Sequence, residues 1–185
     1  MNENKTEDDW PDYYKVLGEF IVNFENITYA LREDSSFLLT AKGLKDEILP
    51  QIIFGQRFFT AEPLLSSYVA IVNHLLKNIP ESKPLSNRLD DFRKRFIKLI
   101  QSRNDIVHST HFFVESINVI GPIRTVTDFK AFKPNPKLTG YNLKRTLRSE
   151  IVEYSKLLKE LKKEFKLFKE DLHKHLLNNK VIQSD

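Results

Sequence analysis

The feature that most constrains the fold of this chain is an apolar repeat in its C-terminal part. Over about five heptads, apolar residues recur there at steps of three or four: Leu143, Leu147, Ile151, Tyr154, Leu158, Leu161, Phe165, Phe168, Leu172 and Leu176. A period near 3.5 predicts one helix roughly 50 Å long, with an apolar seam suited to a bundle or a coiled coil. Because a helix of that length outreaches a small bundle, we expect its end to contact a partner subunit.

Three earlier segments show a helical period as well. Residues 13–31 have apolar side chains at every third or fourth position, which predicts a long amphipathic helix that ends near Asp34. Thr60 is the expected cap of a second helix. A third helix is expected from about Leu85 to near His108. The predicted fold class is therefore mainly α, a four-helix up-and-down bundle.

The pattern changes between the third and the last helix. Residues 111–120 and 123–132 are rich in β-branched and aromatic side chains, and Gly121-Pro122 separates them. This pattern predicts a small β-hairpin at about 111–132, inserted before the C-terminal helix. We expect residues 12–180 to form a single domain, and the polar, acidic residues 1–11 to form a disordered tail.

Composition limits the class of protein. Hydrophobic residues make up 41% of the 185 residues and charged residues 29%, a balance typical of a soluble, single-domain globular protein. No apolar run approaches the roughly 18 residues that a membrane-spanning helix needs. The chain has no cysteine, which excludes disulfides and cysteine-ligated zinc. We therefore expect a cytoplasmic protein that does not contact a membrane.

The candidate for chemistry is the segment from Arg103 to His108, at the end of the third predicted helix. Arginine offers a planar, permanently charged fork for phosphate oxygens, and histidine exchanges protons near neutral pH. The five-residue spacing is common by chance, so the weight lies in the context: Asn104 follows the arginine, and Ser109-Thr110 ends the segment. No cysteine or acidic cluster supports a metal at His108 and His111, and we expect no cofactor.

A mostly helical chain with Arg103-Asn104-x-x-x-His108 at the end of its third long helix resembles the HEPN superfamily. The resemblance covers the helical layout of residues 13–178, but only the motif is specific. It implies a four-helix bundle that forms a homodimer, with two motifs meeting in a metal-independent ribonuclease site. It also implies a role in antiviral defence or in a toxin–antitoxin system, with an antitoxin or another partner protein. Through the resemblance, Glu25 and Asn23 on the first helix are possible accessory residues.

RNA supplies its own nucleophile, the 2′-hydroxyl, so the reaction needs no metal-activated water. His108 would move a proton, Arg103 would stabilise charge on the phosphorane oxygens, and Asn104 would orient one of these groups. Cleavage would leave a 2′,3′-cyclic phosphate and a 5′-hydroxyl. The region between Ser86 and Arg103 is basic, and we expect it to attract a polyanion. Its expected RNA contacts are Arg93, Arg95 and Lys98.

Several alternatives remain open. Residues five apart on a regular helix do not share a face, so either the helix end distorts near Val107 or the site combines two subunits. In a purely structural interpretation, His108 caps the helix and Arg103 pairs with an acid such as Glu25. The alternative function is a non-catalytic bundle that binds a protein partner or its own second copy through the Leu158/Leu161/Phe165 seam. A weaker one is a simple nucleic-acid-binding protein that uses the basic third helix.

Overall fold

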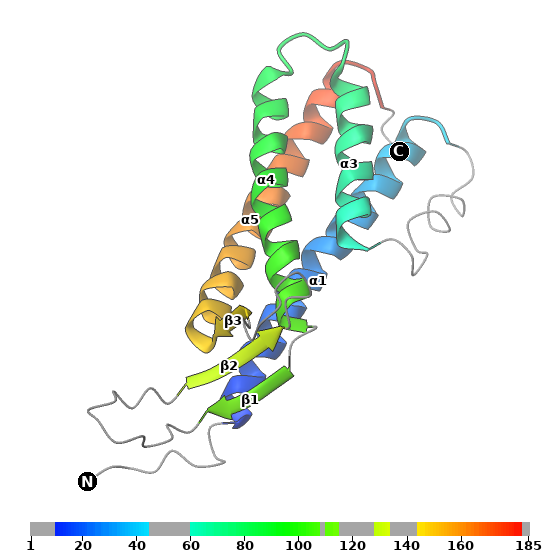
Figure 1. The fold of residues 1–185 in the computed structure, drawn as a ribbon. Coiled ribbons are helices and arrows are strands. Elements are labelled where there is room, and N and C mark those ends of the chain that lie inside the picture. The colour runs from blue at the N-terminus through cyan, green and yellow to red at the C-terminus, as the bar shows by residue number, and fades with distance from the viewer. Residues whose placement is uncertain (1–9, 45–59, 108–109, 115–127, 134–143, 183–185) are drawn as a thin grey trace, which may run out of the picture.

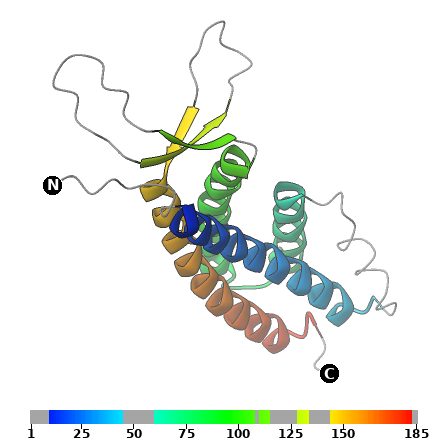
Figure 2. The same cartoon turned by 90° about the horizontal axis from the view of Figure 1, so that it is seen from below.

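The computed structural model describes residues 10–44, 60–107, 110–114, 128–133 and 144–182 of the chain. This part contains four helices, namely α1 (Trp10–Ala41), α3 (Ala61–Leu76), α4 (Lys83–Val107) and α5 (Arg148–Asn178). The helices pack side by side, and a small sheet lies at one end of them (Figures 1 and 2). The prediction of a mainly α fold is thus confirmed. Residues 10 and 11, which were assigned to the tail, belong to α1, and residues 1–9 lie outside the described part.

The helices do not alternate in direction as an up-and-down bundle requires. In the contacts between the α1 and α5 segments, the residue numbers increase in the same direction on both sides: Asn23 contacts Ser155, Asp34 contacts His173, and Lys42 contacts Val181. These two helices are therefore parallel, and α3 points the same way in Figure 1, whereas α4 runs against them. The up-and-down prediction is wrong in this respect. Periodicity reveals which face of a helix is buried but not its direction, and residues 42–60 are numerous enough to span the bundle.

The apolar seam of α5 is the best-predicted element. Every seam residue from Ile151 on is buried except the half-buried Tyr154. The seam packs against the rest of the same chain, with the ring of Phe165 4.8 Å from that of Phe92 and 5.5 Å from that of Tyr68. Two expectations fail here. The helix does not outreach the bundle, because α1 is one residue longer (32 residues against 31). Residues 144–147, expected to open the helix, form a strand.

Helix α1 continues well past its predicted end. The prediction placed the end near Asp34 because the apolar repeat on which it was based runs from Tyr13 to Leu31. Asp34 is instead buried by its neighbours, and Ser35 Oγ donates a hydrogen bond to the carbonyl of Leu31 at 2.7 Å. Thr40 bonds the carbonyl of Ser36 in the same way. Both hydroxyl groups thus form hydrogen bonds within the helix, so these polar residues do not end it.

The sheet has three antiparallel strands, β1 (Thr110–Val114), β2 (Asp128–Lys133) and β3 (Lys144–Leu147), in the order β1-β2-β3. Strand β1 pairs with β2 in the register Thr110↔Phe132, so the two strands begin and end one residue outside the predicted bounds of 111 and 132. The turn predicted at Gly121-Pro122 lies outside the described residues and stays a prediction. Strand β3 was not expected. Leu147 fits the helical spacing of the apolar seam, but it belongs to β3, where it pairs with Lys130 of β2. Pairing between distant segments thus decides its conformation, and the local pattern does not.

A buried carboxylate ties three helices together. Asp34 of α1 is 1% exposed and accepts a hydrogen bond of 2.8 Å from the Tyr68 hydroxyl of α3. Its other oxygen lies 2.7 Å from Nε2 of His173 and 3.7 Å from Nζ of Lys169, both on α5. Burial and the neighbouring Asp34 charge raise the pKa of Tyr68 well above its ordinary value. The tyrosine therefore stays protonated and donates to the carboxylate.

We predict that Asp34→Ala lowers the free energy of unfolding by about 2–4 kcal/mol. The substitution leaves the buried Tyr68 hydroxyl without its acceptor and removes a bond to His173. Urea denaturation measures the change. The control is Glu33→Ala, at an exposed position one residue earlier, which should stay within about 0.5 kcal/mol of the parent chain. Equal losses in the two variants would contradict the role given to Asp34.

Candidate active site

Arg103 lies in the last turns of α4, at the end of the bundle that carries the sheet. Helix α3 covers only the upper part of the bundle in Figure 1, so the side between α1 and α4 is less covered near the sheet. The Arg103 side chain extends from α4 to α1 on this less covered side. Its guanidinium carbon lies 5.6 Å from the centroid of the buried Phe24 ring of α1, a cation–π contact. The aromatic ring therefore fixes where the guanidinium lies.

The polar contacts of Arg103 are long. Nη2 lies 3.4 Å from Oε1 of Glu25, and Nη1 donates to Oδ1 of Asn104 at 3.4 Å. Nε is buried and has no hydrogen-bond partner among the described residues. Nitrogen–oxygen hydrogen bonds are usually near 2.9 Å, so these polar contacts hold the guanidinium only weakly. Because its side chain remains 29% exposed, an incoming anion can still engage it.

The pairing of Arg103 with Glu25 matches the purely structural interpretation of the motif, which named this acid. It also places Glu25 where an accessory site residue would lie, so the pair alone fits both interpretations. The Glu25 side chain is 51% exposed, and its second oxygen accepts a 3.1 Å bond from Thr28. The other candidate, Asn23, points elsewhere: its amide donates to Ser155 of α5 at 3.1 Å. The structure thus brings Arg103, Asn104 and Glu25 together and leaves Asn23 out.

His108 lies outside the described residues. Helix α4 remains α-helical through Val107, and His108 is the next residue of the chain. A distortion of the helix before Val107, one of the two predicted ways to align the pair, is therefore not observed. The site that combines two subunits stays a prediction.

The basic residues expected to contact RNA are not equivalent. Arg95 forms ion pairs with Glu164 of α5 and with Asp91 of its own helix, 3.5 Å away. The hydrogen bond to Glu164 raises the pKa of Arg95. Arg93 and Lys98 are exposed. Of the three, Arg95 thus has its charge compensated within the chain.

Sequence reasoning missed the Asp34–His173 pair. The lysine-rich sequence around His173 favours a solvated side chain, yet its ring centroid lies 4.5 Å from that of Phe37 and its Nε2 contacts Asp34. These residues are 139 positions apart, and no local pattern links them. Among the described residues, no group of three or more His, Cys, Asp and Glu side chains is arranged to hold a metal ion. None of the described helices has the length and apolar character to span a membrane.

Comparisons with protein-family models, with curated proteins and with solved structures find no match for this chain. The site therefore has to be interpreted from its own geometry.

We predict that Glu25→Gln lowers the free energy of unfolding by no more than about 1 kcal/mol, because exposed ion pairs contribute little. The amide keeps the size of the side chain and removes its charge. Thermal or urea unfolding checks the value, and Glu19→Gln, another exposed α1 glutamate with a long ion pair of 3.3 Å, is the matched control. A loss above about 2 kcal/mol for Glu25→Gln would indicate that the pair is structural.

Proposed function

We propose that this protein is a metal-independent endoribonuclease of the HEPN type. RNA cleavage would proceed by attack of the 2′-hydroxyl on the adjacent phosphate. The observation that carries the proposal is the weakly held guanidinium of Arg103, five residues before His108. It is positioned by Phe24, partly exposed, and bonded to Glu25 and Asn104 only over long distances.

Each residue has a distinct role in the proposed reaction. A phosphate displaces the long contact with Glu25 and takes both Nη groups of Arg103, which then stabilise charge on the phosphorane. His108 takes the proton of the 2′-hydroxyl or gives one to the 5′-oxygen that leaves. Asn104 is exposed beside the arginine and orients a phosphate oxygen or the histidine. Glu25 keeps Arg103 in place while no substrate is bound.

The biological setting remains part of the proposal. A metal-independent ribonuclease of this kind would act in the cytoplasm as a toxin or as an antiviral-defence effector, restrained by an antitoxin or another partner protein. The resemblance of Arg103-Asn104-x-x-x-His108 to the HEPN motif supports this setting, as does the mainly helical fold.

RNA cleavage by the purified protein in EDTA tests the proposal. The parent chain should release fragments with 2′,3′-cyclic phosphate ends. Arg103→Ala and His108→Ala should each slow the reaction by at least about 100-fold, because each removes a group that acts in the transition state. Gln101→Ala, at an exposed position of the same helix, should retain the parent rate.

Two further controls make the test decisive. Circular dichroism must show that each variant is folded, and RNA with 2′-O-methyl groups must stay intact because it lacks the nucleophile. Cleavage that persists in a folded His108→Ala variant would refute the proposed site. Absence of cleavage by the parent chain across a broad RNA panel would favour the alternative function.

That alternative is a non-catalytic bundle that binds a second copy or a protein partner. The seam first expected to bind a partner is not available, because Leu158, Leu161 and Phe165 are buried within the chain. A different face, on α1, exposes large apolar side chains. Tyr14, Val22 and Tyr29, at steps of eight and seven along α1, are 58%, 60% and 61% exposed. Gly18 lies between the first two and leaves open space around its backbone.

We place the second subunit of the proposed homodimer on this face of α1. Large apolar side chains that remain exposed at helical spacing favour burial against another surface. Val22→Lys should then shift the protein from dimer to monomer in sedimentation equilibrium, while Ala70→Lys, on the exposed face of α3, should not. A parent chain that stays monomeric at every concentration would rule out the dimer, and an unaffected variant would rule out this face.

A further inference from the structure

The charged residues of α5 are sorted onto two flanks of its apolar seam. One flank is acidic, with residues at steps of seven or four: Glu153, Glu160, Glu164 and Asp171. The other flank and the outer face carry lysines at short helical steps, which we name the lysine stripe: Lys156, Lys159, Lys162, Lys163, Lys166 and Lys174. All of these residues are exposed. Residues three, four or seven apart share a helix face, so the four acidic residues form one row. Lys156, Lys163 and Lys174 lie beside that row on the outer face, whereas Lys159, Lys162 and Lys166 lie farther round on the other flank, and Glu170 lies among the lysines.

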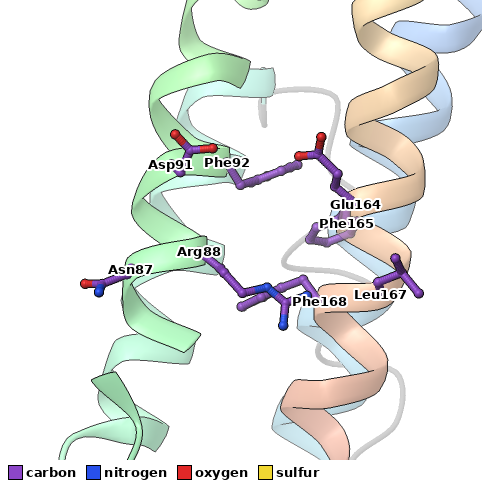
Figure 3. Close-up of a pocket in the computed structure, with 8 residues that line it drawn as sticks. All are labelled: Asn87, Arg88, Asp91, Phe92, Glu164, Phe165, Leu167 and Phe168. Carbon is purple, nitrogen blue, oxygen red and sulfur yellow. The ribbon is translucent and has the colours of Figure 1, made fainter. Parts of the chain in front are cut away.

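The acidic flank faces α4. Asp171 pairs with Arg88 at 2.6 Å, and Glu164 pairs with Arg95. Figure 3 shows the groove between the two helices, a cavity of about 410 Å³, in which Arg88 reaches towards Phe168. The guanidinium carbon of Arg88 lies 5.6 Å from the centroid of that ring. Two arginines of α4 are therefore compensated by α5, which weakens the positive potential expected on α4.

The lysine stripe has far less compensation. Lys159 lies 3.3 Å from Glu19 of α1, and Lys166 lies 4.0 Å from Glu170, both in exposed ion pairs that water weakens. Among the described residues, the remaining members have no carboxylate in ion-pair contact: Lys156, Lys162, Lys163 and Lys174. From first to last they extend over about 27 Å along the helix.

We infer that the lysine stripe of α5 binds the sugar–phosphate backbone of RNA. A row of exposed ammonium groups attracts a chain of phosphates, and the release of condensed counterions makes such binding favourable without base contacts. The inference rests on the proposed function only in taking RNA as the polyanion. The contact surface that we infer is therefore the outer face and the opposite flank of α5, and not α4, where Arg93, Arg95 and Lys98 were expected to bind RNA.

The experiment measures binding of a fluorescent, single-stranded 2′-O-methyl RNA to the full chain by anisotropy over a range of salt concentrations. This RNA cannot be cleaved, so binding is measured independently of catalysis. The stripe variant replaces Lys156, Lys162, Lys163 and Lys174 with glutamine. We expect at least about a tenfold loss of affinity, and a fall of up to about 3 in the slope of log K against log salt, near 0.7 for each lost phosphate contact.

The control replaces four exposed lysines elsewhere with glutamine: Lys15, Lys77, Lys83 and Lys94. Both variants lose the same net charge, so an affinity change confined to the stripe variant supports the inference. Equal losses in the two would overturn it, since net charge would then explain binding. Binding of the parent chain to phosphatidylserine vesicles but not to RNA would overturn it too. If the stripe variant still cleaves RNA and binds it as tightly as the parent chain, this inference is wrong, but the proposed function is not contradicted.

Discussion

Burial of the apolar seam of α5 fixes the rotation of that helix, and the direction of its polar side chains follows from the rotation. Leu158, Leu161 and Leu172 are fully buried, so the helix cannot turn without exposing them. The same rotation directs Glu164 and Asp171 towards α4, and His173 towards the buried Asp34. Helix α5 thus determines both the packing of the core and the distribution of charge around it.

This distribution of charge bears on the proposed site. Arg88 and Arg95 are paired with carboxylates of α5, whereas among the described carboxylates Arg103 contacts Glu25 of α1, at the long distance of 3.4 Å. Of these three arginines, the one nearest to His108 therefore has the weakest contact for a phosphate to replace. The uncompensated lysines lie on the outer face and the far flank of α5, so the surface proposed to hold RNA and the residues proposed to cleave it belong to different helices.

The sequence predicted what periodicity and local chemistry determine. The buried seam of α5 and the positions of α3 and α4 were recognised because each presents a repeated apolar face. Pairing of Arg103 with an acid such as Glu25 was named as the purely structural interpretation of the motif, and the structure has this contact. The parallel arrangement of α1 and α5, strand β3 and the Asp34–His173 pair were missed. Each depends on contacts between distant segments, which carry no signal in a local pattern.

Lysine footprinting tests the central claim, that the rotation of α5 presents its lysines to RNA while its carboxylates pair with Arg88 and Arg95 of α4. The full chain is acylated with and without bound 2′-O-methyl RNA, and each lysine is followed by mass spectrometry. The account predicts protection of Lys156, Lys162 and Lys163, with Lys94 and Lys98 of α4 reacting equally in both states. Protection centred on Lys94 and Lys98, with the α5 lysines unchanged, would contradict it.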